Sequence, residues 1–147
     1  MGKRLKVMVK EGKNLAVRDL RSSDPYVVLK FGPNVASTRV VKKNLNPVWN
    51  QEFIFPVMDD NHLLKLYVWD KDRWGRDDKM GKAEIDVRGV MEKDLNSDKV
   101  VSPCKENFLY KDSHIVQRQD GGKVQEACLQ LRNVESGFLT IQLEWPL

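Results

Sequence analysis

Apolar and polar residues alternate along this chain in short runs that are separated by turn residues. Near the start, Leu5, Val7 and Val9 alternate with lysines and a methionine, and near the end every second residue from Leu139 to Trp145 is apolar. Successive side chains of a strand point to opposite faces, so this period of two predicts strands with one buried face. The chain is therefore expected to fold as an all-β antiparallel sandwich.

Eight strands are expected, joined in an up-and-down run. They span residues 5–10, 26–31, 37–43, 51–57, 63–69, 82–87, 124–132 and 138–145. The connection between the sixth and seventh strands, residues 88–123, is much longer than a usual loop, so it is expected to be a functional insertion with a short helix at 90–95. The 147 residues are expected to form a single domain, 1–147, around one core.

Aspartates gather in two of the predicted turns. Asp19 and Asp24 lie in the first turn, and Asp70, Asp72 and Asp78 lie in the fifth. In an up-and-down run the first, third and fifth turns share one end, so these carboxylates should crowd together. Two like charges about 4 Å apart repel by roughly 4 kcal/mol at an effective dielectric of about 20, so such a cluster needs a cation. Calcium, which takes several hard oxygen ligands, fits best; the alternative is that aspartate is simply a common turn residue.

Composition and charge narrow the possible partners. With 41% hydrophobic and 31% charged residues the chain has the composition of a soluble protein, and no apolar run approaches the length of a membrane span. The net charge is +4 although several acids would be committed to one pocket. The remaining surface is therefore basic, which suits anionic lipid or nucleic acid. Nucleic acid is not expected as a partner, because no reading helix or stacking motif is present.

The sequence gives little support for an enzyme or for a protein built on disulfides or a zinc site. The chain has only two histidines, His62 and His114, and it has no Gly-x-Ser-x-Gly and no glycine-rich phosphate loop, so it is not expected to be an enzyme. Cys104 and Cys128 have neither disulfide-framework nor zinc-ligand spacing. Free thiols indicate a reducing compartment, the cytoplasm or the nucleus.

Three motifs occur in order along the chain: Ser23-Asp24-Pro25-Tyr26, then Asn46-Pro47-Val48-Trp49-Asn50, then the aspartate turn followed by Met80-Gly81. Together they resemble the C2 domain family, the calcium- and lipid-binding module first described in protein kinase C. The resemblance implies that the calcium ligands are the side chains of Asp19, Asp24, Asp70, Asp72 and Asp78 and the backbone carbonyls of Arg18 and Lys71. The last strand looks like the strand that opens the synaptotagmin type of this fold, which implies the circularly permuted, type II topology.

Over the whole chain the sequence resembles the small plant C2-domain proteins of the abscisic-acid-related group, one rice member of which is also described as a GTPase-activating protein. The segments Asn14–Asp19 and Asp77–Gly81 carry this likeness, as does the stretch Val134–Gly137 before the last strand. The resemblance implies calcium-dependent phospholipid binding and recruitment of abscisic acid receptors to membranes. In some members it also implies regulation of a G protein.

Two lipid contacts are expected. Arg73, Trp74 and Arg76 should surround the mouth of the acidic pocket, where an exposed Trp suits the membrane interface and arginines attract anionic lipid. The alternative for Trp74 is ordinary loop packing. A second patch, like the family's phosphoinositide site, is expected on the outward faces of strands two, three and five, with a plain solvated face as the alternative. It comprises Tyr26, Lys30, Arg39, Lys43 and Trp69.

The expected function is reversible docking on anionic membranes when calcium rises, with an abscisic acid receptor or a G protein carried there as partner. The expected location is the cytoplasmic side of the plasma membrane, and also the nucleus. The insertion is expected to contact the partner through Phe108, Leu109, Tyr110 and Ile115, unless these residues pack on a sheet. The alternatives are a calcium-independent interaction scaffold, a direct GTPase-activating regulator, or a fragment of a larger lipid-handling enzyme. The last is disfavoured because the predicted strands begin and end close to the ends of the chain.

Overall fold

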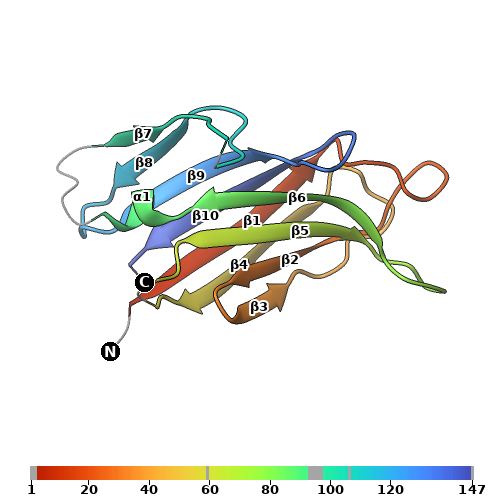
Figure 1. Cartoon of the computed structure of the whole chain (residues 1–147), viewed down its shortest axis with the longest axis horizontal. Coiled ribbons are helices and arrows are strands. Elements are labelled where there is room, and N and C mark those ends of the chain that lie inside the picture. The colour runs from red at the N-terminus through yellow and green to blue at the C-terminus, as the bar shows by residue number, and fades with distance from the viewer. Residues whose placement is uncertain (1–2, 59, 93–97, 106, 147) are drawn as a thin grey trace.

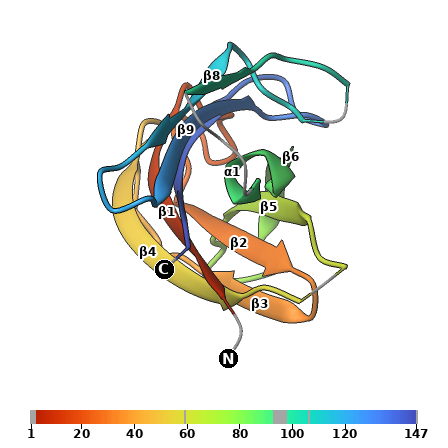
Figure 2. The same ribbon diagram turned by 90° about the vertical axis from the view of Figure 1, so that its left-hand side faces the viewer.

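The alternating segments form two antiparallel sheets that pack face to face (Figure 1, Figure 2). The computed structural model describes residues 3–58, 60–92, 98–105 and 107–146. In the six-stranded sheet the strands run in the order β4-β1-β10-β9-β8-β7, and in the four-stranded sheet the order is β3-β2-β5-β6. The expected all-β antiparallel architecture is confirmed, while the permuted topology stays a prediction from the family resemblance.

The described residues contain ten strands and one helical turn. The elements are β1 (Arg4–Lys13), β2 (Pro25–Phe31), β3 (Asn34–Ser37), β4 (Val48–Pro56), β5 (Leu63–Asp70), β6 (Asp78–Asp86), α1 (Arg88–Met91), β7 (Lys99–Val101), β8 (Ser113–Gln117), β9 (Lys123–Gln130) and β10 (Phe138–Trp145). No helix of the described residues is long and apolar enough to cross a membrane.

The core lies between the two sheets and is built from the apolar positions of the alternating pattern. In β10, for example, Leu139, Ile141 and Leu143 are fully buried while the residues between them are half-buried. The same inward face of β2, β5 and β9 supplies further aliphatic side chains to one continuous cluster. Burying apolar surface stabilises the folded state by about 25 cal/mol per Å², so this cluster is the main stabilising contribution to the fold.

The prediction of a third strand at 37–43 is wrong, because β3 ends at Ser37. The Thr38 hydroxyl accepts the Val27 N–H at 2.9 Å, so a side chain replaces the next ladder bond on β2. The chain then turns toward the other sheet, where the Arg39 N–H donates to the Gln51 side chain at 2.9 Å and the Trp49 indole donates to the Arg39 carbonyl at 3.0 Å. Side-chain hydrogen bonds therefore accompany the end of the strand at Ser37.

The insertion 88–123 adds the two strands that bring the expected eight to ten. β8 pairs with β9, and β7 pairs with β8, so the insertion widens the larger sheet at one edge. A short helical turn is found, but earlier than the predicted 90–95: α1 ends at Met91, because Glu92 is extended at φ −59° and ψ 133°. It packs against β9 and β10, and residues 93–97 lie outside the described part of the chain.

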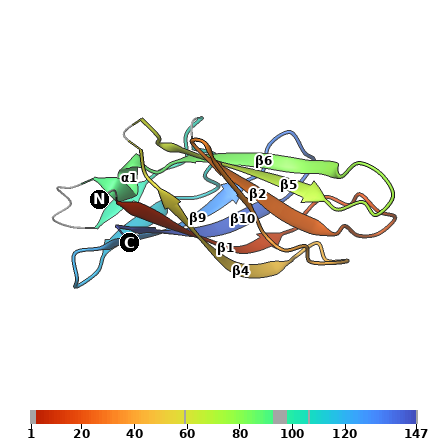
Figure 3. The same ribbon diagram turned by 90° about the horizontal axis from the view of Figure 1, so that it is seen from below.

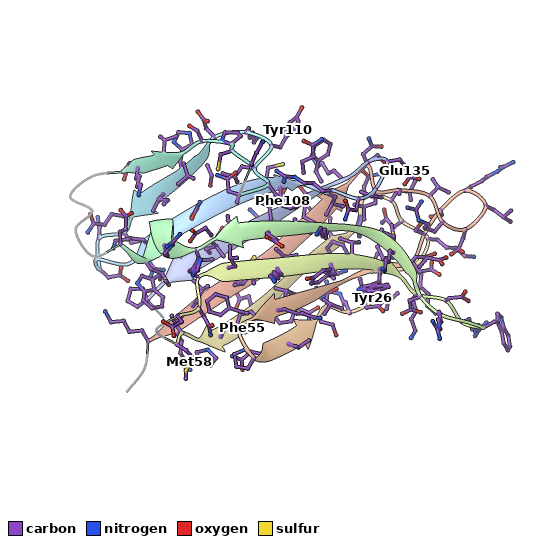
Figure 4. All side chains as sticks on the ribbon, viewed as in Figure 1. Tyr26, Phe55, Met58, Phe108, Tyr110 and Glu135 are labelled. Atoms are coloured by element: carbon purple, nitrogen blue, oxygen red, sulfur yellow. The ribbon has the colours of Figure 1, made fainter. Side chains whose placement is uncertain are left out.

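Most of the insertion residues expected to meet a partner are packed inward instead. Phe108, Leu109 and Ile115 are buried, so their assignment to an exposed surface is wrong. They belong to the continuous hydrophobic core, where burial of apolar surface stabilises the fold. Tyr110 is 56% exposed and contacts the ring of Phe138 edge to face at 4.6 Å between centroids (Figure 4).

Candidate metal centre

The loops after β1, β3 and β5 meet at one end of the sandwich, where the β1–β2 and β5–β6 loops project together in two views (Figure 1, Figure 3). The Lys71 N–H donates to the Asp24 carbonyl at 2.9 Å, and the Asn44 N–H donates to the Ser23 carbonyl at 3.0 Å. The prediction that the first, third and fifth turns share one end is confirmed.

The buried hydroxyl of Ser23 shapes the first loop. It donates to the Ala16 carbonyl at 2.8 Å and accepts the Arg18 N–H at 2.9 Å, which joins the two ends of the loop. Asp19 and Ser22 exchange backbone hydrogen bonds at 2.8 and 2.6 Å, so the loop closes into a tight turn. The turn presents the Asp19 side chain toward the strand end that carries Asp24.

The Asn46-Pro47-Val48-Trp49-Asn50 motif, which begins in the β3–β4 loop, supports the β1–β2 loop. The Asn46 side chain accepts the N–H of Asn14, a residue in the left-handed region at φ 54°. Trp49 is fully buried. The motif is therefore structural: it holds the loop that carries the carboxylates and supplies none of them.

Three of the five predicted carboxylates come together. Asp19, Asp24 and Asp70 each present an oxygen, and these oxygens all lie within 4.8 Å of one another. Asp70 is 1% exposed and accepts the Asp24 N–H at 2.7 Å, while Asp24 accepts the Lys43 N–H at 2.7 Å. Burial, followed by the charges of Asp19 and Asp24, raises the pKa of Asp70 to about 6 against the opposing effect of the Asp24 N–H.

The other two predicted carboxylates lie outside this group of three. Asp72 accepts the Trp74 N–H at 2.9 Å within the β5–β6 loop. Asp78 is exposed and lies directly opposite Asp70 in the β5–β6 ladder, because β6 begins at Asp78 and not at Lys82 as expected. The carboxylate oxygens of Asp19, Asp24 and Asp70 are hard ligands at a spacing that matches the ligand chemistry of calcium. Asp72, in the β5–β6 loop, and Asp78, at the start of β6, flank this group.

The two residues predicted to offer backbone carbonyls flank the carboxylates. Lys71 follows Asp70, and its N–H bonds to Asp24. Arg18 precedes Asp19, and its guanidinium is bound by Glu135 of the β9–β10 connection. Glu135 has no counterpart in the three motifs, so sequence reasoning missed it.

Asp77 is a second residue that sequence reasoning missed. It accepts hydrogen bonds from the Tyr26 hydroxyl and, at 2.9 Å, from the Asp72 N–H, so it ties the β5–β6 loop to β2. Burial and the bond to Asp77 raise the pKa of Tyr26 to about 12. The only signal in the sequence is the pair Asp77-Asp78, of which the family motif uses one member.

Two apolar side chains stand at the loop tips. Trp74 is 90% exposed at the tip of the β5–β6 loop, and Leu20 is 103% exposed in the β1–β2 loop. Leu20 was not predicted as a site residue, although an apolar residue between Asp19 and Arg21 in a turn indicates an exposed apolar loop tip. The arginines beside them are also exposed: Arg21, Arg73 and Arg76.

A groove of about 690 Å³ runs along the outer face of the four-stranded sheet. Its walls are aromatic and basic, and its lining side chains include Tyr26, Lys30, Tyr67, Trp69, Lys79 and Lys82. Tyr26 lies near the loop end of β2 (Figure 4). Lys30 lies over the ring of Tyr67, with Nζ 5.2 Å from the centroid.

The prediction that Arg39 and Lys43 belong to this face is wrong. Both follow the true end of β3: Arg39 donates to the Trp49 carbonyl of the other sheet, and the Lys43 N–H bonds to Asp24 at the metal end. Lys79 and Lys82 of β6 contribute the basic charge of the groove instead.

Comparison with known proteins agrees with this geometry. A family model described as "C2 domain" matches residues 3–101. Over 96% of its length the chain is 45% identical to Protein C2-DOMAIN ABA-RELATED 3 of Arabidopsis thaliana, covering 89% of that protein. It is 43% identical to GTPase activating protein 1 of Oryza sativa subsp. indica, again over 96% of the chain, and covers 90% of that protein.

Solved structures share the fold at lower identity. A C2 domain of plant Extended Synaptotagmin 1 superimposes with a TM-score of 0.66 at 24% identity, over 99% of this chain and 95% of that one. The calcium-bound tandem C2 domains of Extended-Synaptotagmin 2 match with a TM-score of 0.70 at 22% identity, over 98% of this chain and 45% of that one.

Proposed function

The chain belongs to the C2 domain family, and from that premise we propose that it binds calcium at the Asp19, Asp24 and Asp70 cluster and docks on anionic phospholipid membranes. The observation that carries this proposal is the placement of three carboxylate oxygens within 4.8 Å of one another around the buried Asp70. Such a cluster repels itself unless a cation neutralises it. Asp72, Asp78 and the carbonyls of Arg18 and Lys71 are the proposed remaining ligands.

Calcium at this position would turn an acidic loop end into one that attracts phosphate oxygens. The chain's own residues then make the membrane contact. Leu20 and Trp74 would enter the interface with their exposed apolar surface, and Arg73 and Arg76 would interact with anionic headgroups at about 1 kcal/mol each. The groove lined by lysines lies beside this end, and we propose it as a second headgroup site.

Sedimentation with phosphatidylserine vesicles tests the proposal. Wild-type protein should pellet with vesicles in calcium and stay in solution with a chelator. The double variant Asp70→Asn, Asp72→Asn should remain folded and lose the calcium-dependent fraction, because two ligand charges are removed. Asp60→Asn, which changes an exposed aspartate in the β4–β5 loop, is the matched control and should pellet normally. Equal pelleting of the double variant and wild type would refute the calcium site.

We further propose that the membrane-bound protein carries a protein partner at the cytoplasmic face of the plasma membrane, with the nucleus as a second location. The support is similarity to proteins whose names refer to abscisic acid and to GTPase activation. An abscisic acid receptor and a G protein are thus the proposed candidates. Replacing the exposed insertion residues Val100, Tyr110 and Val116 by serine should leave vesicle binding intact and abolish partner capture; retained capture would place the partner site on another face.

Direct GTPase activation is the second candidate, because the name of one relative states it. A further relative, ADP-ribosylation factor GTPase-activating protein AGD12 of Arabidopsis thaliana, is 42% identical over 96% of this chain, but the chain spans only 44% of that protein. GTP turnover by a candidate G protein, measured with and without this chain, separates activation from recruitment.

A further inference from the structure

The guanidinium of Arg18 is fixed at the edge of the carboxylate cluster by four hydrogen bonds. It donates to both carboxylate oxygens of Glu135 at 2.8 and 2.9 Å, to the Lys79 carbonyl at 3.0 Å and to the Val17 carbonyl at 3.1 Å. Glu135 lies in the β9–β10 connection, at the same end of the sandwich as the loops (Figure 4). A bidentate pair of this kind fixes the orientation of the guanidinium as well as its position.

This position brings a permanent positive charge close to the proposed calcium ligands. Lys79 directly follows Asp78, and Asp78 lies opposite Asp70 in the β5–β6 ladder. The bond to Lys79 therefore anchors Arg18 beside the strand pair that carries two of the carboxylates. Hydrogen bonding to Glu135 is the first cause that raises the pKa of Arg18, and the charges of Asp78 and Asp70 raise it further.

Glu135 competes with the cluster for this charge. An arginine side chain is long and flexible, and a guanidinium released from Glu135 would find Asp78 and Asp70 as neighbouring anions. There it would neutralise the carboxylates that calcium needs. Held by Glu135, it remains at the rim and leaves the carboxylate oxygens to the metal.

We propose that Arg18 is the built-in counter-ion of the carboxylate cluster and that Glu135 is the positioning residue that holds it back, so that the pair sets the affinity for calcium. This inference rests on the proposed function, because it concerns the same metal site. It differs from a plain structural tie between the β1–β2 loop and the β9–β10 connection, which would only keep the loop in place.

Calcium titration of three variants separates the two roles. Arg18→Gln removes the charge and should raise calcium affinity by roughly two- to tenfold. Arg18→Lys keeps the charge but cannot form the two-pronged bond, so it should lower the affinity by a similar factor, as should Glu135→Gln. In the double variant Arg18→Gln, Glu135→Gln the effect of the glutamate change should vanish. A structural tie predicts lower affinity in every variant, and that result would overturn the proposal.

A calcium-free measurement keeps this test separate from the proposed function. In chelator, Arg18→Gln should lower the melting temperature, and it should do so less in an Asp70→Asn background, because the counter-ion then has less charge to neutralise. Additive effects of the two changes would overturn the counter-ion role. Absence of calcium binding in the wild-type protein, with the non-additive result intact, would refute the proposed function and the effect on calcium affinity, and would leave the counter-ion role of Arg18 standing.

Discussion

Replacing Asp70 by asparagine should stabilise the calcium-free protein at neutral pH. The side chain is 1% exposed, and burial with the charges of Asp19 and Asp24 raises its pKa from 3.8 to about 6. A carboxyl whose pKa is higher in the folded than in the unfolded protein lowers the free energy of unfolding above the unfolded pKa, and by the full amount where the folded form is also ionised. An asparagine amide carries no charge, so this loss disappears.

The size of the effect follows from the shift. The pKa of Asp70 rises from 3.8 to about 6. At about 1.4 kcal/mol per pKa unit, the ionised carboxylate lowers the free energy of unfolding by roughly 3 kcal/mol. The asparagine oxygen can still accept the Asp24 N–H, but that bond loses its charge assistance, which costs about 1 kcal/mol. The net gain of about 2 kcal/mol should raise the melting temperature by about 6 °C in a domain of this size.

The pH dependence distinguishes this cause from a general change in packing. As the pH falls through about 6, the folded wild-type carboxyl takes up its proton before the unfolded one does, so wild-type stability rises. Asparagine has nothing to protonate. The advantage of the variant should therefore shrink by about 1.4 kcal/mol between about pH 7.5 and about pH 5.

Thermal unfolding in a chelator at the two pH values is the assay, with Asp60→Asn as the control that should match wild type at both. A variant no more stable than wild type at neutral pH would refute the argument. So would an advantage that is the same at both pH values.

Three other substitutions test the two loop tips and the packing of β6. Trp74→Ala and Leu20→Ala should each speed dissociation from vesicles, roughly tenfold for Trp74, and leave calcium affinity in solution unchanged; a loss of calcium affinity would show that the side chain supports the loop instead. Gly81→Ala should lower stability by about 3 kcal/mol in denaturant unfolding, because Gly81 has a φ of 111° and a Cβ would lie 2.6 Å from a Val134 methyl. Gly121→Ala, at a φ of 86° where no described atom lies within 4 Å of the added Cβ, is its control and should cost only about 1 kcal/mol; equal losses would contradict the packing argument.

The local pattern of the sequence is sufficient to predict the sandwich and the end at which the carboxylates gather. Alternation with a period of two decides which side chains face inward, and buried Leu139, Ile141 and Leu143 follow it. Turn order along an up-and-down run then places Asp24 beside Asp70, and the bond from the Asp24 N–H to Asp70 confirms it. Both inferences need only neighbouring residues and the order of the strands.

Only the tertiary structure decides where a strand stops and which distant side chains meet. The sequence predicts a strand that continues to Lys43, yet hydrogen bonds that involve the side chains of Thr38, Trp49 and Gln51 accompany the end of β3 at Ser37 and hold Arg39 away from the groove. Burial of Ile115 likewise depends on strands that the insertion adds to the sheet.

The contact between Arg18 and Glu135 shows the same limit at the site itself. The two residues are 117 positions apart in the chain, and neither belongs to a repeating pattern that would predict their pairing. They meet because β6 and the β9–β10 connection are joined at the sheet edge by reciprocal backbone bonds between Lys82 and Arg132, at 3.0 and 2.8 Å. Which charge neighbours the carboxylates is therefore a property of how the two sheets pack, and no local spacing encodes it.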